Sequence, residues 1–565
     1  MIDNKKNVDI VVSLLKKHRI HHVVISPGGT NISFVKAVQD DTFFRCYSVV
    51  DERSAIYFAI GLYLQTGEII ATSCTSAQAT RNYIPGLTEA FYKRVPILAI
   101  TMSKHPRFTY QEYMQAPDQC SLPKDCVKKS FSLPVISEKD DILHSIRLAN
   151  EAILELSHHE MGPVQLCIPW LDFPLGDFTP QVRKIQRYKL EEKWNIELNG
   201  KRVLIVVGEH LPFNYESQKI FEDFCESCDC AVYTNLLSNY NGKYSFSGNL
   251  FFSTISVLDF KQEFKPDIII SIGGQTGDYP LYGILSKQSL NDIEHWRIST
   301  SGNVIDTYDK LTKIFECSEN RFFSELTSQE KAVHMYYNNI LERLNFDLNI
   351  DIPFSNVSVA RELTQMIPEN STVQLSILNS LRVWNLFDFK NKVNCFANVG
   401  AFGIDGGMST LIGQSVISKN LCFIVIGDLA FFYDMNSLGI RGLKNNLRIL
   451  LINNNGGVEF KLDMSGDKSI NRFIAAGDHF KNAKGWAETC GFKYISAYNQ
   501  KEFEEQKKCF ISNSKMPILF EIFVSDVDDA WAYNKIIKSN KDNSTAEMLK
   551  EGIKTSVKKF LSRKI

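Results

Sequence analysis

The sequence lacks several features that would place it in a broad class of protein. No run of 18 apolar residues occurs among its 565 residues, so we expect no membrane-spanning helix, and the first segment lacks the continuous apolar core of a signal peptide. The formal net charge is only -1, so no excess of positive charge favours nucleic acid or an anionic membrane as a partner. These absences favour a cytoplasmic protein that acts on small molecules.

Two common kinds of binding motif are also missing. The 13 cysteines are scattered, apart from Cys225, Cys228 and Cys230 in "CESCDC", and neither a second C-x-x-C pair nor a nearby histidine completes a zinc site. We therefore expect reduced, mostly buried thiols. The sequence contains no GxxxxGK[ST] loop, which excludes the P-loop class of nucleotide site.

Short apolar runs alternate with helical patterns along most of the chain. The runs form three sets, at 21–26, 68–74, 95–101 and 163–169, then at 202–208 and 267–273, and finally at 394–400, 422–428, 448–454 and 517–524. Such runs, separated by helical stretches, indicate buried strands of parallel sheets. We predict an α/β protein with three domains, at residues 1–180, 195–345 and 355–530, followed by a basic helical tail at 539–565.

The most informative motif places polar residues after two strands of the third set. Asp428 and Leu429 follow one apolar run, and Asn455 and Gly457 in "INNNGG" follow the next, 27 residues later. Because the carboxyl ends of parallel strands meet at one edge of a sheet, we expect Asp428 and Asn455 to lie side by side. A carboxylate oxygen, an amide oxygen and the backbone carbonyl of Gly457 suit Mg²⁺. A helix that begins near Leu429 would favour an anion at its N-terminus.

With "GDL" at 427–429 and "NN" about 27 residues later, the chain resembles the thiamine-diphosphate-dependent enzymes. In that family an aspartate, an asparagine and a backbone carbonyl hold Mg²⁺, which holds the diphosphate. The resemblance assigns these ligand roles to Asp428, Asn455 and Gly457, with Gly427 and Leu429 in the same cofactor-binding motif. We therefore expect thiamine diphosphate and Mg²⁺ as cofactors.

A second motif of the same family occurs near the N-terminus. "VVDERSA" at 49–55 puts Glu52 at the junction of a strand and a helix. The resemblance makes Glu52 the catalytic acid that contacts the aminopyrimidine ring of the cofactor and promotes removal of the thiazolium C2 proton. It also makes Ile404, in "FGIDGG", the bulky residue that bends the cofactor into its reactive shape.

Over nearly its whole length the chain is similar to the 2-succinyl-5-enolpyruvyl-6-hydroxy-3-cyclohexene-1-carboxylate (SEPHCHC) synthases of menaquinone biosynthesis. The matching pieces include "SPGG" (26–29), "DERSA" (51–55), "MQAPDQ" (114–119), "GPVQLCIP" (162–169), "LNSLRV" (378–383), "ANVGAFGIDGGMST" (397–410) and "GDLAFFYDMNSL" (427–438). The resemblance implies a pyrimidine-binding, a central and a diphosphate-binding domain in a homodimer or homotetramer. Active sites then lie between two subunits, where Glu52 meets Asp428 of another chain.

Several arginines of that family are absent from this chain. Thr30 stands in place of the arginine of "SPGSRS", Trp384 in place of the one after "NSLVV", and Val399 in place of the one in "NRGASGIDG", while "SKHP" offers Lys104 and His105. In the family these arginines bind the carboxylates of 2-oxoglutarate and isochorismate. Threonine, tryptophan and valine cannot reproduce a bidentate guanidinium contact. We expect a 2-oxoacid decarboxylase or carboligase, a paralogue of the SEPHCHC synthases with less anionic substrates.

The candidate substrate residues follow from the same resemblance and its departures. They are Thr30, Lys104, His105, Gln115, Asn379, Ser380, Arg382 and Glu459, the last at a place where the family tends to have an apolar residue. Three alternatives remain open: SEPHCHC synthase activity itself, a non-catalytic cofactor-binding scaffold, and a nicotinamide oxidoreductase, for which no fingerprint is present. "SIGGQTGD" (271–278) lacks a full GxGxxG and is typical of a central-domain loop, although some thiamine-dependent relatives bind FAD in that domain.

Overall fold

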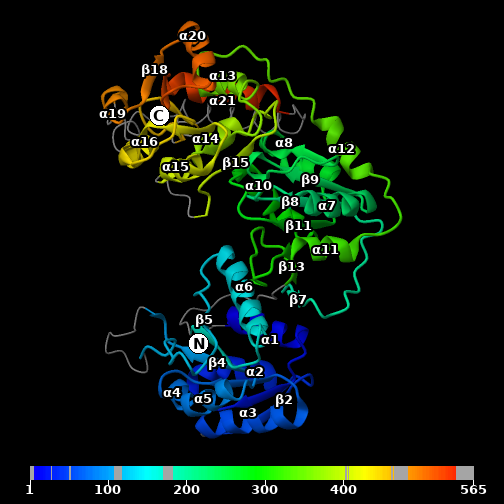
Figure 1. Cartoon of the computed structure of the whole chain (residues 1–565). Helices are drawn as coiled ribbons and strands as arrows, with labels where there is room; N and C mark the ends of the chain where they lie inside the picture. Colours follow the sequence, from blue (N-terminus) through cyan, green and yellow to red (C-terminus); the bar gives the residue numbers. More distant parts are fainter. Residues whose placement is uncertain are drawn as a thin grey trace, which may run out of the picture. The chain divides into compact units, whose positions relative to one another are not determined.

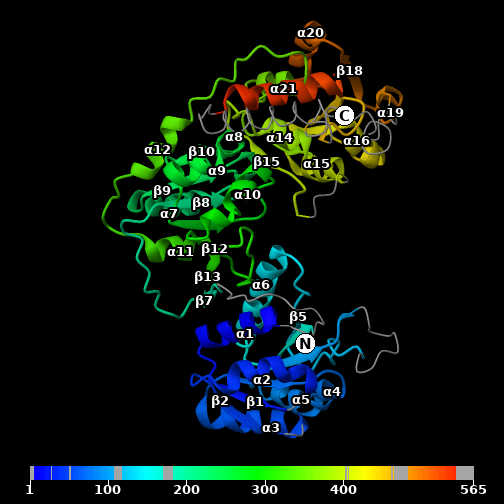
Figure 2. The same ribbon diagram turned by 180° about the vertical axis from the view of Figure 1, so that it is seen from behind.

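A computed structural model describes residues 5–26, 28–49, 52–106, 117–169, 182–400, 404, 406–459, 462 and 481–541 (Figures 1 and 2). The chain divides into two compact units. Unit 1 comprises residues 1–194 and 299–317, and unit 2 comprises residues 195–298 and 318–565. Within the described residues, no helix is long and apolar enough to cross a membrane.

Unit 1 is built on a six-stranded sheet whose named strand pairs are parallel. The strand order is β2 (Arg45–Ser48), β1 (His22–Ile25), β3 (Ile70–Cys74), β4 (Ile97–Ser103), β6 (Val164–Pro169) and β5 (Ser130–Ser132). One face packs against α1 (Lys5–Lys17), α2 (Ile32–Gln39) and α6 (Lys139–Glu155), and the other against α3 (Glu52–Thr66), α4 (Gln78–Asn82) and α5 (Ile84–Tyr92). Val23 and Val24 pack into opposite cores because successive strand side chains alternate between faces.

Unit 1 also contains a short parallel pair, β7 (Gln186–Tyr188) and β13 (Leu311–Phe315), in register from Lys313 beside Gln186 to Phe315 beside Tyr188. This pair joins two segments of unit 1 that are more than 100 residues apart in the sequence. Ile185, Leu311 and Ile314 form a small core there with Leu154 at the end of α6.

Unit 2 begins with a second sheet, in which five strands pair in parallel. Their order is β10 (Ser245–Ser247), β9 (Cys230–Thr234), β8 (Val203–Val207), β11 (Ile268–Ile272) and β12 (Glu294–Ile298). Helix α7 (Tyr215–Ser227) packs with α11 (Glu319–Leu326), and α8 (Gly248–Thr254) packs with α10 (Tyr279–Leu285). The thiols of Cys225, Cys228 and Cys230 are buried and not in disulfides.

The third sheet, also in unit 2, carries the Asp428 and "NNNGG" motifs. Its parallel strands follow the order β15 (Asn394–Phe396), β14 (Thr372–Leu375), β16 (Cys422–Gly427), β17 (Leu447–Asn453), β19 (Ile518–Phe523) and β18 (Lys493–Ala497). Helices α13 (Asn356–Leu363), α14 (Asn379–Trp384), α20 (Gln500–Ile511) and α21 (Asp526–Ser539) cover one face, and α15 (Gly407–Ile417), α16 (Asp428–Asp434) and α19 (Lys484–Thr489) cover the other.

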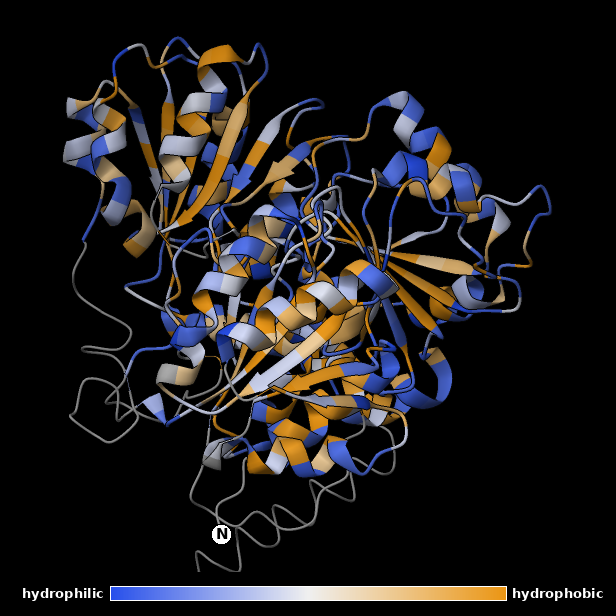
Figure 3. Cartoon of the chain, turned by 90° about the horizontal axis from the view of Figure 1, so that it is seen from below, coloured by the Kyte–Doolittle hydropathy of each residue, from blue (hydrophilic) through white to orange (hydrophobic). Residues whose placement is uncertain are grey.

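The predicted α/β fold with parallel sheets is confirmed. Each apolar run that predicted a strand contains one. Figure 3 shows the reason, since the strands are mostly apolar while the helices alternate between polar and apolar residues. The sequence missed short or polar strands such as β2, whose residues "RCYS" are largely exposed and form no apolar run.

Candidate cofactor and substrate site

Asp428 lies against the glycine-rich turn at 453–457, at the carboxyl edge of the third sheet. The parallel register of β16 and β17 pairs Gly427 with Ile452, so the two strands leave the sheet at the same level. Asp428 begins α16 and is only 2% exposed. Its Oδ2 accepts a hydrogen bond from the backbone N–H of Gly456 at 2.8 Å, and its Oδ1 accepts one from Leu429 at 2.7 Å. The two motifs therefore form one polar site.

Burial raises the pKa of Asp428 to about 6, although the backbone N–H groups of Gly456, Leu429 and Asn455 act in the opposite direction. A cation beside this carboxylate would stabilise its charged form. Asn455 has a left-handed backbone with φ of 61°, which asparagine tolerates, and Gly456 has φ of 125°, which favours glycine. The backbone geometry of the turn alone thus explains why asparagine occupies position 455 and glycine position 456.

Asn453 and Asn454, to which the sequence assigned no role, hold buried carboxylates beneath the turn. The Nδ2 of Asn453 donates to Glu521 Oε1 at 2.8 Å, and the Nδ2 of Asn454 donates to Asp529 Oδ2 at 2.9 Å. Burial raises the pKa of Asp529 to about 6 and also raises that of Glu521. These amides satisfy acids that would otherwise be costly to bury. An acid inside the apolar run "PILFEIF" is the only sequence signal for this arrangement.

Arg382 and Glu459 form a bidentate ion pair. Arg382 Nη1 lies 2.6 Å from Glu459 Oε2, and its Nη2 lies 2.7 Å from Oε1. Arg382 belongs to α14, which follows β14, and Glu459 follows the turn after β17. The pair therefore links α14 to the segment after β17 at the carboxyl edge of the sheet. Ser380 is buried and Asn379 half-buried on the same helix. Both charged residues are among the candidates predicted from the sequence, but their pairing was not predicted.

In unit 1, several predicted residues follow the strands at the carboxyl edge of the first sheet. Thr30 is buried, its Oγ1 lies 2.7 Å from Thr75 Oγ1, and the same Oγ1 accepts a hydrogen bond from Ser76 N–H at 3.0 Å. A Cβ added to Gly28 would lie 2.2 Å from Thr75 Cβ, so this close approach of the β1 and β3 loops requires glycine. Lys104 and His105 follow β4 and are half-buried.

Glu52 is half-buried at the first residue of α3, after β2. Burial raises the pKa of the Cys74 thiol to about 12, and the nearby charge of Glu52 adds to this shift. Glu52 therefore lies close to the end of β3. Gln115 lies outside the described residues, and so does most of the predicted tail at 539–565.

Comparison with known proteins identifies the family of the chain. Residues 5–122 match the family model described as thiamine pyrophosphate enzyme, N-terminal TPP binding domain. The SEPHCHC synthase of Bacteroides fragilis is 33% identical over 561 residues, which cover 94% of this chain and 98% of the relative. The chain belongs to the thiamine pyrophosphate enzyme family. The SEPHCHC synthase of Phocaeicola vulgatus is 34% identical, with 94% and 97% covered, and that of Flavobacterium psychrophilum is 27% identical, with 91% and 95% covered.

The residues of this thiamine pyrophosphate enzyme fit the cofactor of the family. Asp428 is a buried carboxylate beside the turn that contains Asn455 and Gly457, and carboxylate, amide and backbone carbonyl oxygens are the kinds of ligand that Mg²⁺ prefers. Ile404 packs against both apolar cores that flank the third sheet, so its side chain is supported from both faces. Gly427, at the end of β16, is half-buried.

Trp384 and Val399, which stand where the resemblance implies arginine, are part of the core of this thiamine pyrophosphate enzyme. Trp384 is fully buried, and its Nε1 donates to Asn356 Oδ1 at 3.2 Å. Val399 is also fully buried. Neither side chain offers a charge to a ligand.

Sequence reasoning missed Gln119, a buried residue of the "MQAPDQ" segment. Its Oε1 accepts a hydrogen bond from Ala77 N–H at 2.7 Å, and its Nε2 donates to Thr80 Oγ1 at 3.3 Å. Gln119 thereby fixes the loop after β3 and the start of α4. No local pattern distinguishes it from Gln115 in the sequence.

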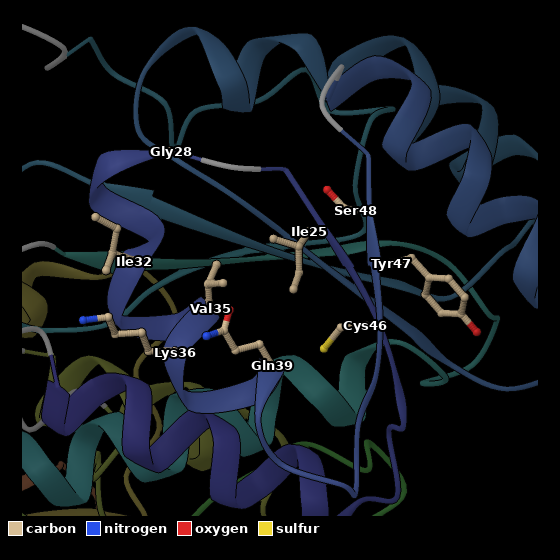
Figure 4. A pocket seen from close by; sticks show the side chains of 9 residues that line it. All are labelled: Ile25, Gly28, Ile32, Val35, Lys36, Gln39, Cys46, Tyr47 and Ser48. Atoms are coloured by element: carbon tan, nitrogen blue, oxygen red, sulfur yellow. The ribbon is translucent and has the colours of Figure 1, made fainter.

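A cavity of about 490 Å³ lies between α2 and β2 in unit 1 (Figure 4). Ile32, Val35, Lys36 and Gln39 of α2 line it, together with Ile25, Gly28, Cys46, Tyr47 and Ser48. None of the predicted site residues lines this cavity, and it contains no carboxylate. Most of its lining surface is apolar.

Proposed function

We propose that this protein is a Mg²⁺- and thiamine-diphosphate-dependent enzyme that decarboxylates a 2-oxoacid less anionic than 2-oxoglutarate. The acyl group then passes to an acceptor without a dicarboxylate, such as an aldehyde, a ketone or a sugar-like carbonyl compound, or simply to a proton. The observation that carries the proposal is the bidentate pair of Arg382 and Glu459.

The cofactor roles rest on the residues at the two motifs. Asp428, Asn455 and the carbonyl of Gly457 would hold Mg²⁺ and through it the diphosphate, and Ile404 would support the cofactor from below. When bound, thiamine diphosphate supplies a carbanion nucleophile and an electron sink for loss of CO₂. Glu52 would exchange a proton with the aminopyrimidine ring, which requires a carboxyl group within hydrogen-bonding reach of a ring nitrogen. Glu52 and Asp428 would come from different copies of the chain, in a homo-oligomer.

The proposed substrate class depends on which cationic side chains of the site can bind a substrate carboxylate. Glu459 engages both terminal nitrogens of Arg382, so a carboxylate already occupies the end-on bidentate face of this guanidinium. Thr30 is hydrogen-bonded to Thr75 and Ser76. Each charge-assisted contact that a substrate loses weakens its binding by about 1.5–3 kcal/mol. Lys104 would then be the cation that binds the single carboxylate of the 2-oxoacid, with Asn379, Ser380 and His105 as polar neighbours.

SEPHCHC synthase activity is the second candidate, because identity to the enzymes of that name reaches 33–34% over 94% of the chain. A CO₂-release assay with Mg²⁺ and thiamine diphosphate separates the two. We expect pyruvate or a similar monocarboxylic 2-oxoacid to be turned over at least 100-fold more efficiently than 2-oxoglutarate. Efficient turnover of 2-oxoglutarate in the presence of isochorismate would establish the second candidate instead.

A further inference from the structure

Outside the candidate cofactor site, unit 1 brings together two histidines and a glutamate. His158 and His159 lie in the loop between α6 and β6, and Glu316 directly follows β13. His158 Nε2 is 3.9 Å from Glu316 Oε2, and His159 Nδ1 is 3.5 Å from Glu316 Oε1. One ligand atom from each residue falls within 4.8 Å of the other two, which is close enough for one ion to bind all three.

The side chain of Lys128 holds the loop that carries the histidines by binding its backbone carbonyls. The ammonium group of Lys128 donates to the carbonyls of Glu155, His158 and Glu160 at 2.6 to 2.7 Å. His159 has a left-handed backbone with φ of 57°, which follows from this sharp turn. The two imidazole rings stack with their centroids 3.9 Å apart. The histidines are therefore positioned without any contribution from an ion.

A carboxylate lies beside Nδ1 of His158, where many metal-binding histidines have a hydrogen-bond acceptor. Its Nδ1 lies 3.1 Å from Glu155 Oε2, while its Nε2 faces Glu316 and the carbonyl of Ser301 at 3.3 Å. A histidine that donates Nδ1–H to a carboxylate presents a basic Nε2 to a metal, and this arrangement accompanies most histidine ligands.

Glu316 has an oxygen that lacks a hydrogen-bond partner. Its Oε2 is buried and accepts no hydrogen bond, although the Nε of Arg187 lies 3.7 Å away. A Cβ at Gly302 would lie 2.4 Å from this oxygen, so the glycine leaves the space that the carboxylate occupies. Burying a charged oxygen without a hydrogen bond is costly, and a coordinated ion would lower this cost.

We propose that His158 Nε2, His159 Nδ1 and the Glu316 carboxylate bind a zinc ion. Two imidazoles and one carboxylate form a common zinc ligand set, with water in the fourth position. The ion would link the loop after α6 to the segment after β13, two parts of unit 1 separated by more than 150 residues. His159 is exposed, so the ion can enter from solvent. Mg²⁺ competes poorly here because it prefers oxygen ligands.

The test uses the full-length protein saturated with Mg²⁺ and thiamine diphosphate. Zinc is titrated in a calorimeter, and the zinc retained after dialysis is measured by atomic emission. We expect one zinc ion per chain in the parent protein. His159→Asn, which tolerates the left-handed backbone, and Glu316→Gln should each weaken binding at least tenfold. Glu155→Gln should weaken it by about 10- to 100-fold, because it removes the carboxylate behind His158.

A matched control is His144→Asn, because His144 is an exposed histidine on α6 of the same unit. This variant should bind zinc as the parent does. The melting temperature supplies a second measurement, since zinc should raise it in the parent and in His144→Asn but not in His159→Asn. Equal zinc affinity in the parent, His159→Asn and Glu316→Gln, or no retained zinc in the parent, would overturn the proposal.

Discussion

Arg382 Nη1 and Nη2 lie 2.6 Å and 2.7 Å from the two carboxylate oxygens of Glu459. Both side chains are only partly exposed, at 18% and 25%, so water screens their interaction less than at a fully exposed surface. The pair lies at the carboxyl edge of the sheet that carries Asp428. A charge that is already neutralised within the protein is a weak receptor for a second carboxylate, and the proposed substrate preference follows from this.

Glu459→Gln should shift the substrate preference toward dicarboxylates. The substitution removes the anion that engages Arg382, so the guanidinium can accept a substrate carboxylate. We expect kcat/KM for 2-oxoglutarate to rise about tenfold relative to that for pyruvate, which corresponds to roughly one charge-assisted hydrogen bond.

Glu362→Gln is the matched control for that experiment. Glu362 pairs with Lys507 at 2.6 Å and has the same 25% exposure as Glu459, but it lies outside the candidate site. Its variant should leave the ratio of the two kcat/KM values unchanged. If both variants leave the ratio unchanged, Arg382 does not select the substrate.

Asp428→Asn should abolish tight binding of thiamine diphosphate. The change removes the charged oxygen from the proposed Mg²⁺ site while conserving the size of the side chain, and we expect affinity to fall at least 100-fold. Calorimetric titration of thiamine diphosphate in the presence of Mg²⁺ measures this loss. Asp526→Asn, at the first residue of α21, is the control. Unchanged affinity of Asp428→Asn would place the diphosphate elsewhere.

Glu52→Gln should bind the cofactor but lose most of its decarboxylation. Removing a general acid or base typically costs 10²- to 10⁴-fold in rate, so we expect kcat to fall by at least 100-fold. A mixture of Glu52→Gln and Asp428→Asn chains, unfolded and refolded together, should regain part of the activity if the two residues come from different subunits. A non-catalytic scaffold would show no CO₂ release in any of these proteins.

Asp529 should make the folded state less stable as the pH rises through its titration range. Its folded pKa is raised from the ordinary aspartate value of 3.8 to about 6, so between these values the folded state binds more protons than the unfolded state. The free energy of unfolding should therefore fall between about pH 4 and pH 6, by about 3 kcal/mol from this group, and then level off. Urea unfolding of the parent and of Asp529→Asn at pH 4.5 and pH 7.5 measures the difference.

Asp529→Asn should lose stability relative to the parent at pH 4.5 and recover much of that difference at pH 7.5, because its amide does not titrate. Asp428 and Glu521 also have raised pKa values and remain in both proteins. Because the charge of Asp428 also raises the pKa of Asp529, the difference between the two proteins reports Asp529 together with its interaction with Asp428. The same pH dependence in both proteins would contradict this assignment.

The sequence by itself determined the fold class, the family and the neighbouring positions of Asp428 and the 453–457 turn. These features depend on local patterns, because apolar runs of strand length form buried parallel strands, and parallel strands bring their carboxyl ends to one edge. The expected thiamine pyrophosphate enzyme fold and family are accordingly confirmed. The short edge strands were missed because their residues are polar.

Only the tertiary structure decided which side chains meet across long intervals of sequence. Arg382 and Glu459 are 77 residues apart, and Asn454 and Asp529 are 75 residues apart. Neither pair has a local pattern, because each depends on how separate loops leave the sheet and on which carboxylates are buried there. His158 and Glu316 are likewise joined only by the packing of unit 1. Sequence motifs thus predicted the candidate cofactor site, whereas long-range packing determined which charged side chains pair with one another.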